Sequence, residues 1–217
     1  MHRATPRPRR TLLAVAVPVG LVLSAALTWQ STYAAFSATT DNAGNSWRSG
    51  SVVLADGDNG VALFSTAADG ALRPGSTRSR CIRVDYTGDL PVDVRLYVGT
   101  PPAGATTLDQ YLVMSVQRGT DVAAGATTPA DCSAFLPGTP TQFPYNTRQA
   151  DDPAADPLRT LADLKGAHGT YGTGLAVASA VAPDTHLTFK ITYVVVDDNA
   201  AQHAESAATF TWEARNT

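Results

Sequence analysis

Residues 185–196 of the chain read THLTFKITYVVV, and this stretch decides the class of fold. Apolar side chains occupy every second position, and mostly polar ones fall between them. Alternation with a period of two places the two sets on opposite faces of a β-strand, so one face is expected to pack on a core. The stretch therefore predicts a long strand with this inward face: Leu187, Phe189, Ile191, Tyr193 and Val195.

The same alternation recurs elsewhere, and turn residues separate the repeats. The clear strand patterns cover residues 79–86, 92–98 and 207–214, and weaker ones cover 51–55, 61–65, 108–117 and 175–181. Seven to nine short strands with few helices predict an all-β fold, a jelly-roll-like antiparallel β-sandwich.

Three segments between these strands carry their own predictions. The sequence DGDNG at residues 56–60 supplies turn residues and predicts a hairpin that joins 51–55 to 61–65. Residues 123–156 are rich in Pro, Gly, Thr and Asp, which predicts a long surface loop. Residues 157–165 (PLRTLADLK) predict the one short helix, with Gly166 just after its end.

The first 34 residues predict a signal peptide, an N-terminal helix that directs export. A basic start is followed by an apolar stretch, and Thr32 and Ala34 suit positions −3 and −1 of a signal-peptidase site, with the cut near Ala34 or Ala35. The alternative is an uncleaved membrane anchor over residues 12–29, which could just span a thin bilayer. Pro and Gly inside the apolar stretch favour cleavage. We therefore expect a secreted protein with a signal peptide (1–34), a flexible N-terminal segment (35–50) and a β-sandwich domain (51–217).

Composition and charge exclude several classes of protein. Apolar residues make up 44% of the 217 residues, enough for one well-buried core. Loss of the four leader arginines changes the formal net charge from −3 to −7, the opposite of what a nucleic-acid-binding domain carries. No second apolar run approaches 18 residues, so the rest of the chain is not expected to span a membrane repeatedly.

Two cysteines, Cys81 and Cys132, are the only ones in the chain. In an exported protein an even pair favours a disulfide, which here would tie the predicted loop back to the sandwich. Two separate free thiols are the alternative. No histidine lies near either cysteine in sequence, so a structural role is expected in both cases.

Residues suited to catalysis or metal binding are few. His168, His186 and His203 are isolated, and no His-Glu-x-x-His motif is present. Residues 56–60 resemble the start of an EF-hand loop, but Ala67 stands where the bidentate glutamate should be, so a turn is the better interpretation. We expect no metal, no cofactor and no enzymatic activity.

The N-terminal region resembles a known family. The sequence TYAAF at residues 32–36, Trp47, and SGSVVL at 49–54 resemble the N-terminus of the TasA/camelysin family of Gram-positive surface proteins. LRPG at 72–75 is similar to a turn of that family, residues 90–96 to its paired strands, and ATFTWEA at 208–214 to its closing strand. The two cysteines, the short end after that closing strand and the scarcity of lysine are departures. High Ala, Arg and Pro content suggests an actinobacterial relative.

This resemblance implies a jelly-roll fold and export through a SipW-type signal peptidase. Better-known members build extracellular biofilm fibres by donating an N-terminal strand to the next subunit, itself or a homologous partner. By analogy, the donor is residues 35–46, which begin with Ala35 and the anchor Phe36 and are followed by Trp47. The alternatives are that this segment is only a linker, that the protein anchors or caps fibres of another protein, or that it is a camelysin-like metalloprotease.

Overall fold

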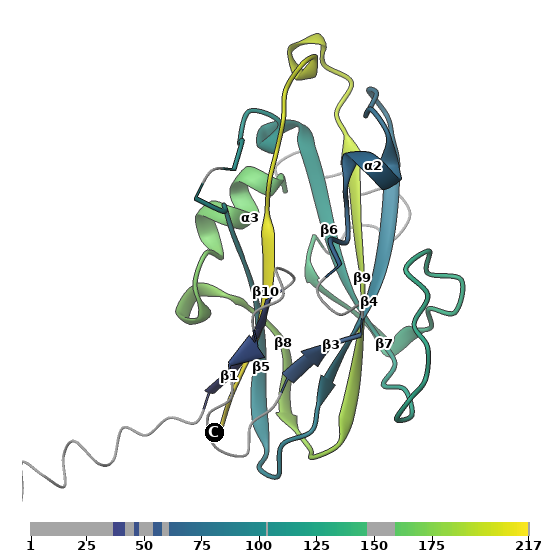
Figure 1. The fold of residues 1–217 in the computed structure, drawn as a ribbon, viewed down its shortest axis with the longest axis vertical. Coiled ribbons are helices and arrows are strands. Elements are labelled where there is room, and N and C mark those ends of the chain that lie inside the picture. Colours follow the sequence, from purple (N-terminus) through teal and green to yellow (C-terminus); the bar gives the residue numbers. More distant parts are fainter. Residues whose placement is uncertain are drawn as a thin grey trace, which may run out of the picture. The chain divides into compact units, whose positions relative to one another are not determined.

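The computed structural model describes residues 37–41, 46–47, 54–57, 61–102, 104–146 and 159–216, all within the compact unit Phe36–Thr217. Two antiparallel five-stranded sheets make up this unit, in the strand orders β2-β1-β10-β5-β8 and β3-β4-β9-β6-β7 (Figure 1). The predicted all-β sandwich is confirmed. The strands are β1 (Ser37–Asp41), β2 (Ser46–Trp47), β3 (Leu54–Asp56), β4 (Thr77–Tyr86), β5 (Val92–Gly99), β6 (Leu112–Gly119), β7 (Pro137–Tyr145), β8 (Leu175–Val181), β9 (Thr185–Val195) and β10 (Thr209–Asn216).

The central pair of the second sheet is β4 and β9. They pair over ten residues, from Thr77 opposite Val194 to Tyr86 opposite Thr185. The predicted inward face of β9 is buried at 4% exposure or less: Leu187, Phe189, Ile191, Tyr193 and Val195. On β4 the alternating residues Ile82, Val84 and Tyr86 are buried at 2% or less. Each such side chain contributes roughly 1.5–3 kcal/mol on burial, so this face forms much of the core.

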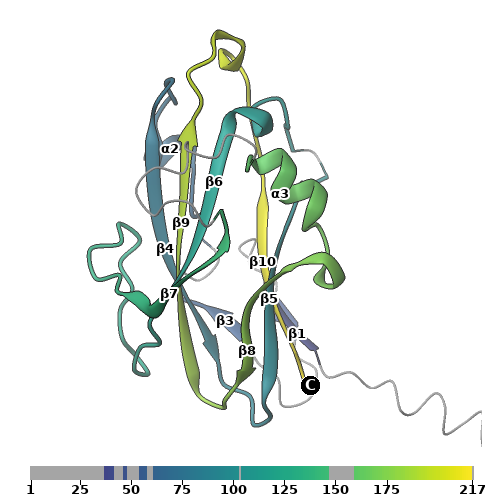
Figure 2. The same cartoon turned by 180° about the vertical axis from the view of Figure 1, so that it is seen from behind.

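Strand β10 occupies the corresponding place in the first sheet. It pairs with β5 over eight residues, and its inward side chains include Phe210 and Trp212. The rings of Trp212 and Phe189 lie 5.7 Å apart between centroids, so they join the two sheets across the core. Figure 2 shows β10 and β5 running side by side.

Helix α3 (Leu161–Ala167) confirms a helix in this region but not its predicted bounds. Thr160 caps it, because its side chain accepts a hydrogen bond from the Asp163 N–H while the Asp163 carboxylate accepts from the Thr160 N–H. The helix runs past Gly166, which the sequence placed after its end, because the His168 N–H still donates to the Leu164 carbonyl at 2.9 Å. The predicted start, residues 157–158, lies outside the described residues. A second helix, α2 (Thr66–Asp69), is a single turn.

The predicted hairpin between residues 51–55 and 61–65 is wrong. Strand β3 pairs with the end of β4 instead, with Leu54 opposite Tyr86, and residues 61–65 form no strand. Leu63 is 6% exposed, and the Phe64 ring packs on Tyr193 at 5.0 Å. The long edge of β4 gives β3 a distant pairing partner that local turn chemistry does not reveal.

The predicted loop at 123–156 also contains an unpredicted strand, β7. It carries Pro137, Pro140 and Pro144, which cannot donate backbone hydrogen bonds and so lowered its strand signal. The strand is tolerated because it lies at the edge of its sheet and pairs with β6 in an irregular register.

Candidate functional site: the strand edge at β10

The described part of the predicted donor segment forms a strand on the chain's own sheet. Strand β1 pairs antiparallel with β10 in a five-residue register, from Ser37 opposite Arg215 to Asp41 opposite Thr211. The short strand β2 pairs in turn with β1, and Trp47 lies opposite Thr39. Figure 1 shows β1 beside β10. Residues 37–41 therefore extend the sheet past β10.

The remaining predicted residues of this region are placed only in part. Thr32 and Ala34 of the predicted signal-peptidase site lie outside the described residues, as do Ala35 and Phe36 of the donor segment. The backbone of Trp47 lies in β2. The structure thus brings the middle of the donor segment, residues 37–41, to β10.

The outer face of β10 carries a linked group of charged and aromatic side chains. The Tyr97 hydroxyl donates to the Glu213 carboxylate at 3.1 Å, and the Arg215 Nε donates to the other carboxylate oxygen at 2.8 Å. The Arg215 guanidinium carbon lies 3.8 Å from the centre of the Tyr171 ring. Burial is the largest cause that raises the pKa of the Tyr171 hydroxyl. These contacts hold the face opposite the core in one arrangement.

On the inner face of β10, one buried polar atom lacks a partner. Trp212 is 1% exposed, and its Nε1–H finds no hydrogen-bond acceptor among the described residues. An unsatisfied buried donor costs about 1–3 kcal/mol. In the strand register Trp212 lies opposite Thr40 of β1.

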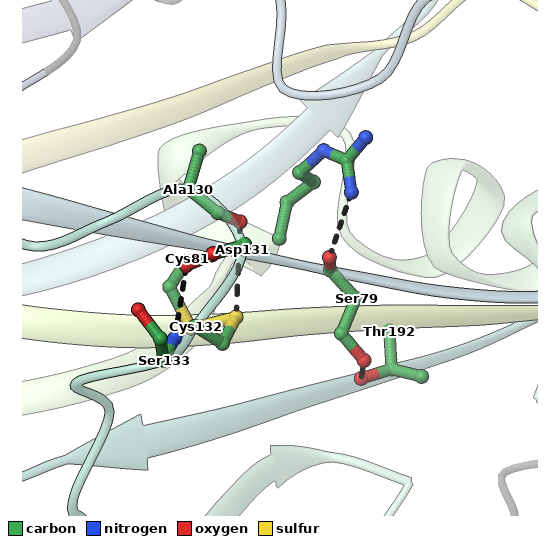
Figure 3. Close-up of a disulfide and its surroundings, with 8 residues drawn as sticks. Ser79, Cys81, Ala130, Asp131, Cys132, Ser133 and Thr192 are labelled. Carbon is green, nitrogen blue, oxygen red and sulfur yellow. Dashed lines mark hydrogen bonds between the residues drawn. A yellow bond between two sulfur atoms is a disulfide. The ribbon is translucent and has the colours of Figure 1, made fainter. Parts of the chain in front are cut away.

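A second ordered feature is the disulfide between Cys81 and Cys132. The two residues are 51 positions apart, with Cα atoms separated by 5.1 Å. The Cys81 N–H donates to the Ala130 carbonyl at 3.1 Å, beside the disulfide (Figure 3). The Asp131 carboxylate accepts from the Ser133 N–H at 3.0 Å, and this hydrogen bond is the largest cause that lowers the pKa of Asp131. The segment around Cys132 is therefore fixed against β4.

Further hydrogen bonds attach the start of the same loop to β9. The Thr188 hydroxyl donates to the Thr120 carbonyl at 2.8 Å, and the Val122 N–H donates to the His186 carbonyl at 3.0 Å. His186 Nδ1 lies 2.7 Å from an Asp85 carboxylate oxygen. The start of the loop thus continues the pairing along β9, where Val122 and His186 form an isolated antiparallel bridge.

The three histidines of the sandwich lie in separate environments. His186 pairs with Asp85, and the Nδ1 atom of His168 lies 2.6 Å from the Thr173 carbonyl. His203 lies in a turn with a left-handed backbone, φ 59°. Within the described parts of the chain, no three His, Cys, Asp or Glu side chains come together as a metal site would require.

No family model matches the chain, and no curated protein sequence matches it significantly. None of the helices in the described segments is long and apolar enough to cross a membrane.

The sequence did not predict the partners of the side chains on the outer face of β10. Glu213 and Arg215 lie two positions apart on β10, but Tyr97 reaches them from β5 and Tyr171 from the 3₁₀ turn η3 (Tyr171–Thr173), and both contacts depend on the tertiary fold. The alternation of residues 208–214 predicts that Glu213 faces away from the core. It does not predict which side chains Glu213 contacts there.

Proposed function

We propose that the protein is a secreted structural protein of the cell surface or biofilm matrix that assembles into fibres by N-terminal strand donation. In this proposal β1 of one copy occupies the place beside β10 of the next. A SipW-type signal peptidase would cut near Ala34 and free Ala35 and Phe36 at the start of the donated segment. The family resemblance of the N-terminus to TasA/camelysin proteins supports this reading.

The observation that carries the proposal is the register of β1 on β10. The five paired residues, Ser37–Asp41, begin two to three positions after the predicted cut. Main-chain hydrogen bonds supply the affinity in strand addition, so the same segment of another copy can make the same bonds. Donation from each copy to the next is a heterologous contact, and it propagates into a filament when it does not close into a ring.

Whether β1 binds in cis or in trans is decided by concentration. In cis, β1 is tethered to its own sandwich, and a short tether gives an effective concentration on the order of millimolar. The contacts on β10 are the same in both arrangements. Exchange between copies is therefore favoured only at high local concentration, or where a growing fibre adds contacts between neighbouring sandwiches.

The alternative function is an accessory subunit that caps or anchors a fibre built by another protein. A chain that keeps β1 on its own β10 covers its own acceptor edge, which favours this role for a copy that does not exchange its strand. The two functions differ in one respect: a fibre subunit exchanges β1 between copies, and an accessory subunit retains it. A camelysin-like metalloprotease is a third candidate, which zinc analysis and a chelator-sensitive protease assay would test.

The test uses the mature chain that begins at Ala35. One variant lacks residues 35–46, and a second carries Thr39→Pro, which removes a backbone N–H in the middle of β1. Thr39→Val is the matched control because it leaves the backbone donor in place. Light scattering and electron microscopy should show fibres for the mature chain and Thr39→Val and none for the other two. Equal fibre formation by all four chains would refute strand donation.

A further inference from the structure

We propose that the outer face of β10 selects the strand that pairs with it by charge, through Glu213 and Arg215. A donor with an acidic residue opposite Glu213 would bind weakly, as would a donor with a basic residue opposite Arg215. The inference deepens the proposed function and rests on it for the contact between copies. Within one copy it rests on the observed pairing of β1 with β10.

Strand β10 presents two charged side chains on the face that lies away from the core. Trp212 and Ala214 are buried in the core, and side chains alternate along a strand, so Glu213 and Arg215 lie on the opposite face. Glu213 is only 6% exposed, and its carboxylate oxygens accept hydrogen bonds from Tyr97 and Arg215. A charge with little water around it interacts more strongly with its neighbours than an exposed charge does.

Strand β5, on one side of β10, already carries complementary charges. Arg95 lies opposite Glu213, and Asp93 lies opposite Arg215. Opposite charges in directly opposed positions stabilise an antiparallel pair, whereas like charges there destabilise it. The other side of β10 faces β1, so the same rule applies to any strand that takes the place of β1.

The register places an uncharged residue of β1 opposite each of the two charges. Thr39 is opposed to Glu213, and Ser37 is opposed to Arg215. Asp41, the one charged residue of β1, lies opposite neither of them. The native segment therefore brings no like charges together across the pair.

Strand β2, on the far side of β1, adds no charge at position 39. Trp47 lies opposite Thr39 there. Among the described strands, Glu213 is thus the charged residue directly opposed to position 39. Diagonal neighbours in such a pair are about 7–8 Å apart, so Arg215 acts on position 39 more weakly than Glu213 does. We expect the strongest discrimination by charge at this position.

The two charges of β10 define a class of donor strand. An accepted donor carries a neutral or basic residue opposite Glu213 and a neutral or acidic residue opposite Arg215. The segment SATTD of a second copy satisfies both conditions. Like charges in the paired position would disfavour other strands, in the way that specific interfaces disfavour wrong partners.

Two acidic variants of the mature chain that begins at Ala35 test this selectivity in the monomer. Ser37→Asp and Thr39→Asp introduce the same residue two positions apart on one face of β1, so the first is the matched control for the second. Hydrogen exchange at low protein concentration measures the protection of the β1 amide groups. Protection should be about two- to fivefold lower in Thr39→Asp than in Ser37→Asp. Ser37→Lys and Thr39→Lys should show the reverse order.

Glu213→Gln tests whether the Glu213 charge is the cause. It keeps a carbonyl oxygen that can accept from the Tyr97 hydroxyl, and it removes the charge. In this background the higher protection of Thr39→Lys over Thr39→Asp should disappear, while unchanged protection of β4 and β9 would show that the sandwich is folded. Equal protection of β1 in Thr39→Asp and Thr39→Lys with native Glu213 would overturn the proposal. An advantage of lysine that persists in Glu213→Gln would also overturn it.

Fibre formation by the same chains separates this inference from the proposed function. Charge selectivity in the monomer, together with fibres that Thr39→Asp weakens, would support both. Selectivity in the monomer without fibres from any chain would support the inference and refute fibre assembly. Equal fibres from Thr39→Asp and Thr39→Lys, with no selectivity in the monomer, would refute the inference and leave strand donation standing.

Discussion

The Lys165 Nζ atom of α3 lies 2.7 Å from the Asp109 carboxylate, and both side chains are less than 10% exposed. Lys165 also donates to the Ala207 carbonyl at 2.8 Å, and the Ser206 hydroxyl donates to Asp109. Asp109 lies in the 3₁₀ turn η1 (Asp109–Tyr111), and Ser206 precedes β10. One buried ion pair therefore connects α3, the entry to β6 and the entry to β10.

Removal of one partner of this ion pair should lower the free energy of unfolding. Lys165→Met leaves a buried carboxylate without its cation, which typically costs about 3–5 kcal/mol. The double variant Lys165→Met/Asp109→Leu removes both charges and should recover much of that loss. Urea unfolding of the two variants checks this. A double variant that is no more stable than Lys165→Met would contradict the assignment.

The disulfide should contribute to the stability of the folded state. Closing a 51-residue loop reduces the entropy of the unfolded chain, which corresponds to about 4 kcal/mol in the chain-entropy model. The paired substitution Cys81→Ala/Cys132→Ala should lower the free energy of unfolding by about 2–4 kcal/mol. Urea unfolding measures the change. Wild-type stability in the variant would show that the crosslink does not constrain the chain.

Hydrogen exchange can locate the effect of the same substitution. Protection should fall first at Cys81 and Val122, whose N–H groups hold the loop on β4 and at His186. Protection of β10 and β5 should persist, because they pair in the other sheet.

The contribution of the Thr160 cap to the stability of α3 can be tested with two substitutions of Thr160. Thr160→Ala removes the side chain that accepts from the Asp163 N–H, and the loss of such a cap costs about 0.5–2 kcal/mol. Thr160→Ser keeps the hydroxyl and should retain most of the stability. Thermal unfolding distinguishes them, and equal destabilisation by both would show that the methyl group matters and the cap does not.

High pH should weaken the fold through Tyr193. Burial is the main cause that raises the pKa of Tyr193 from 10.0 to about 12, with the Asp69 carboxylate as a second cause. Because the neutral hydroxyl is favoured in the folded state, its contribution is complete below pH 10 and is lost as the pH rises toward 12. Melting temperatures between pH 9 and 12 should fall less steeply for Tyr193→Phe than for the wild type. Parallel curves would contradict this.

The strands with strict alternation could be predicted from sequence, because burial on one face imposes the pattern. Strands β4, β5, β9 and β10 all belong to this group. The pairing of β3 with β4 could not be predicted from sequence, because the choice between a nearby and a distant partner strand depends on the whole sheet. Strand β7 was missed because its prolines resemble those of a loop.

The candidate site was predictable only in outline. The donor segment was proposed from family resemblance, because SATTD at residues 37–41 has no alternation that would mark a strand. Its partner β10 was recognised as a strand, but no local pattern in either segment indicates that they pair. Such pairing depends on contacts between the two ends of the chain.

The most direct measurement asks whether β1 of one copy binds β10 of another. Asp41 and Thr211 are opposed in the register, so cysteines at these positions lie within reach of a disulfide. Light Asp41→Cys chains are mixed with isotopically heavy Thr211→Cys chains under assembly conditions, oxidised and digested. Asn216→Cys replaces Thr211→Cys as the control, because five residues along β10 move it about 17 Å away.

Strand donation predicts peptides that join light residue 41 to heavy residue 211, with none to residue 216. Two results together would contradict strand donation. The first is a double variant, Asp41→Cys/Thr211→Cys, whose disulfide forms only within single chains. The second is the absence of any mixed light–heavy peptide from assembled material.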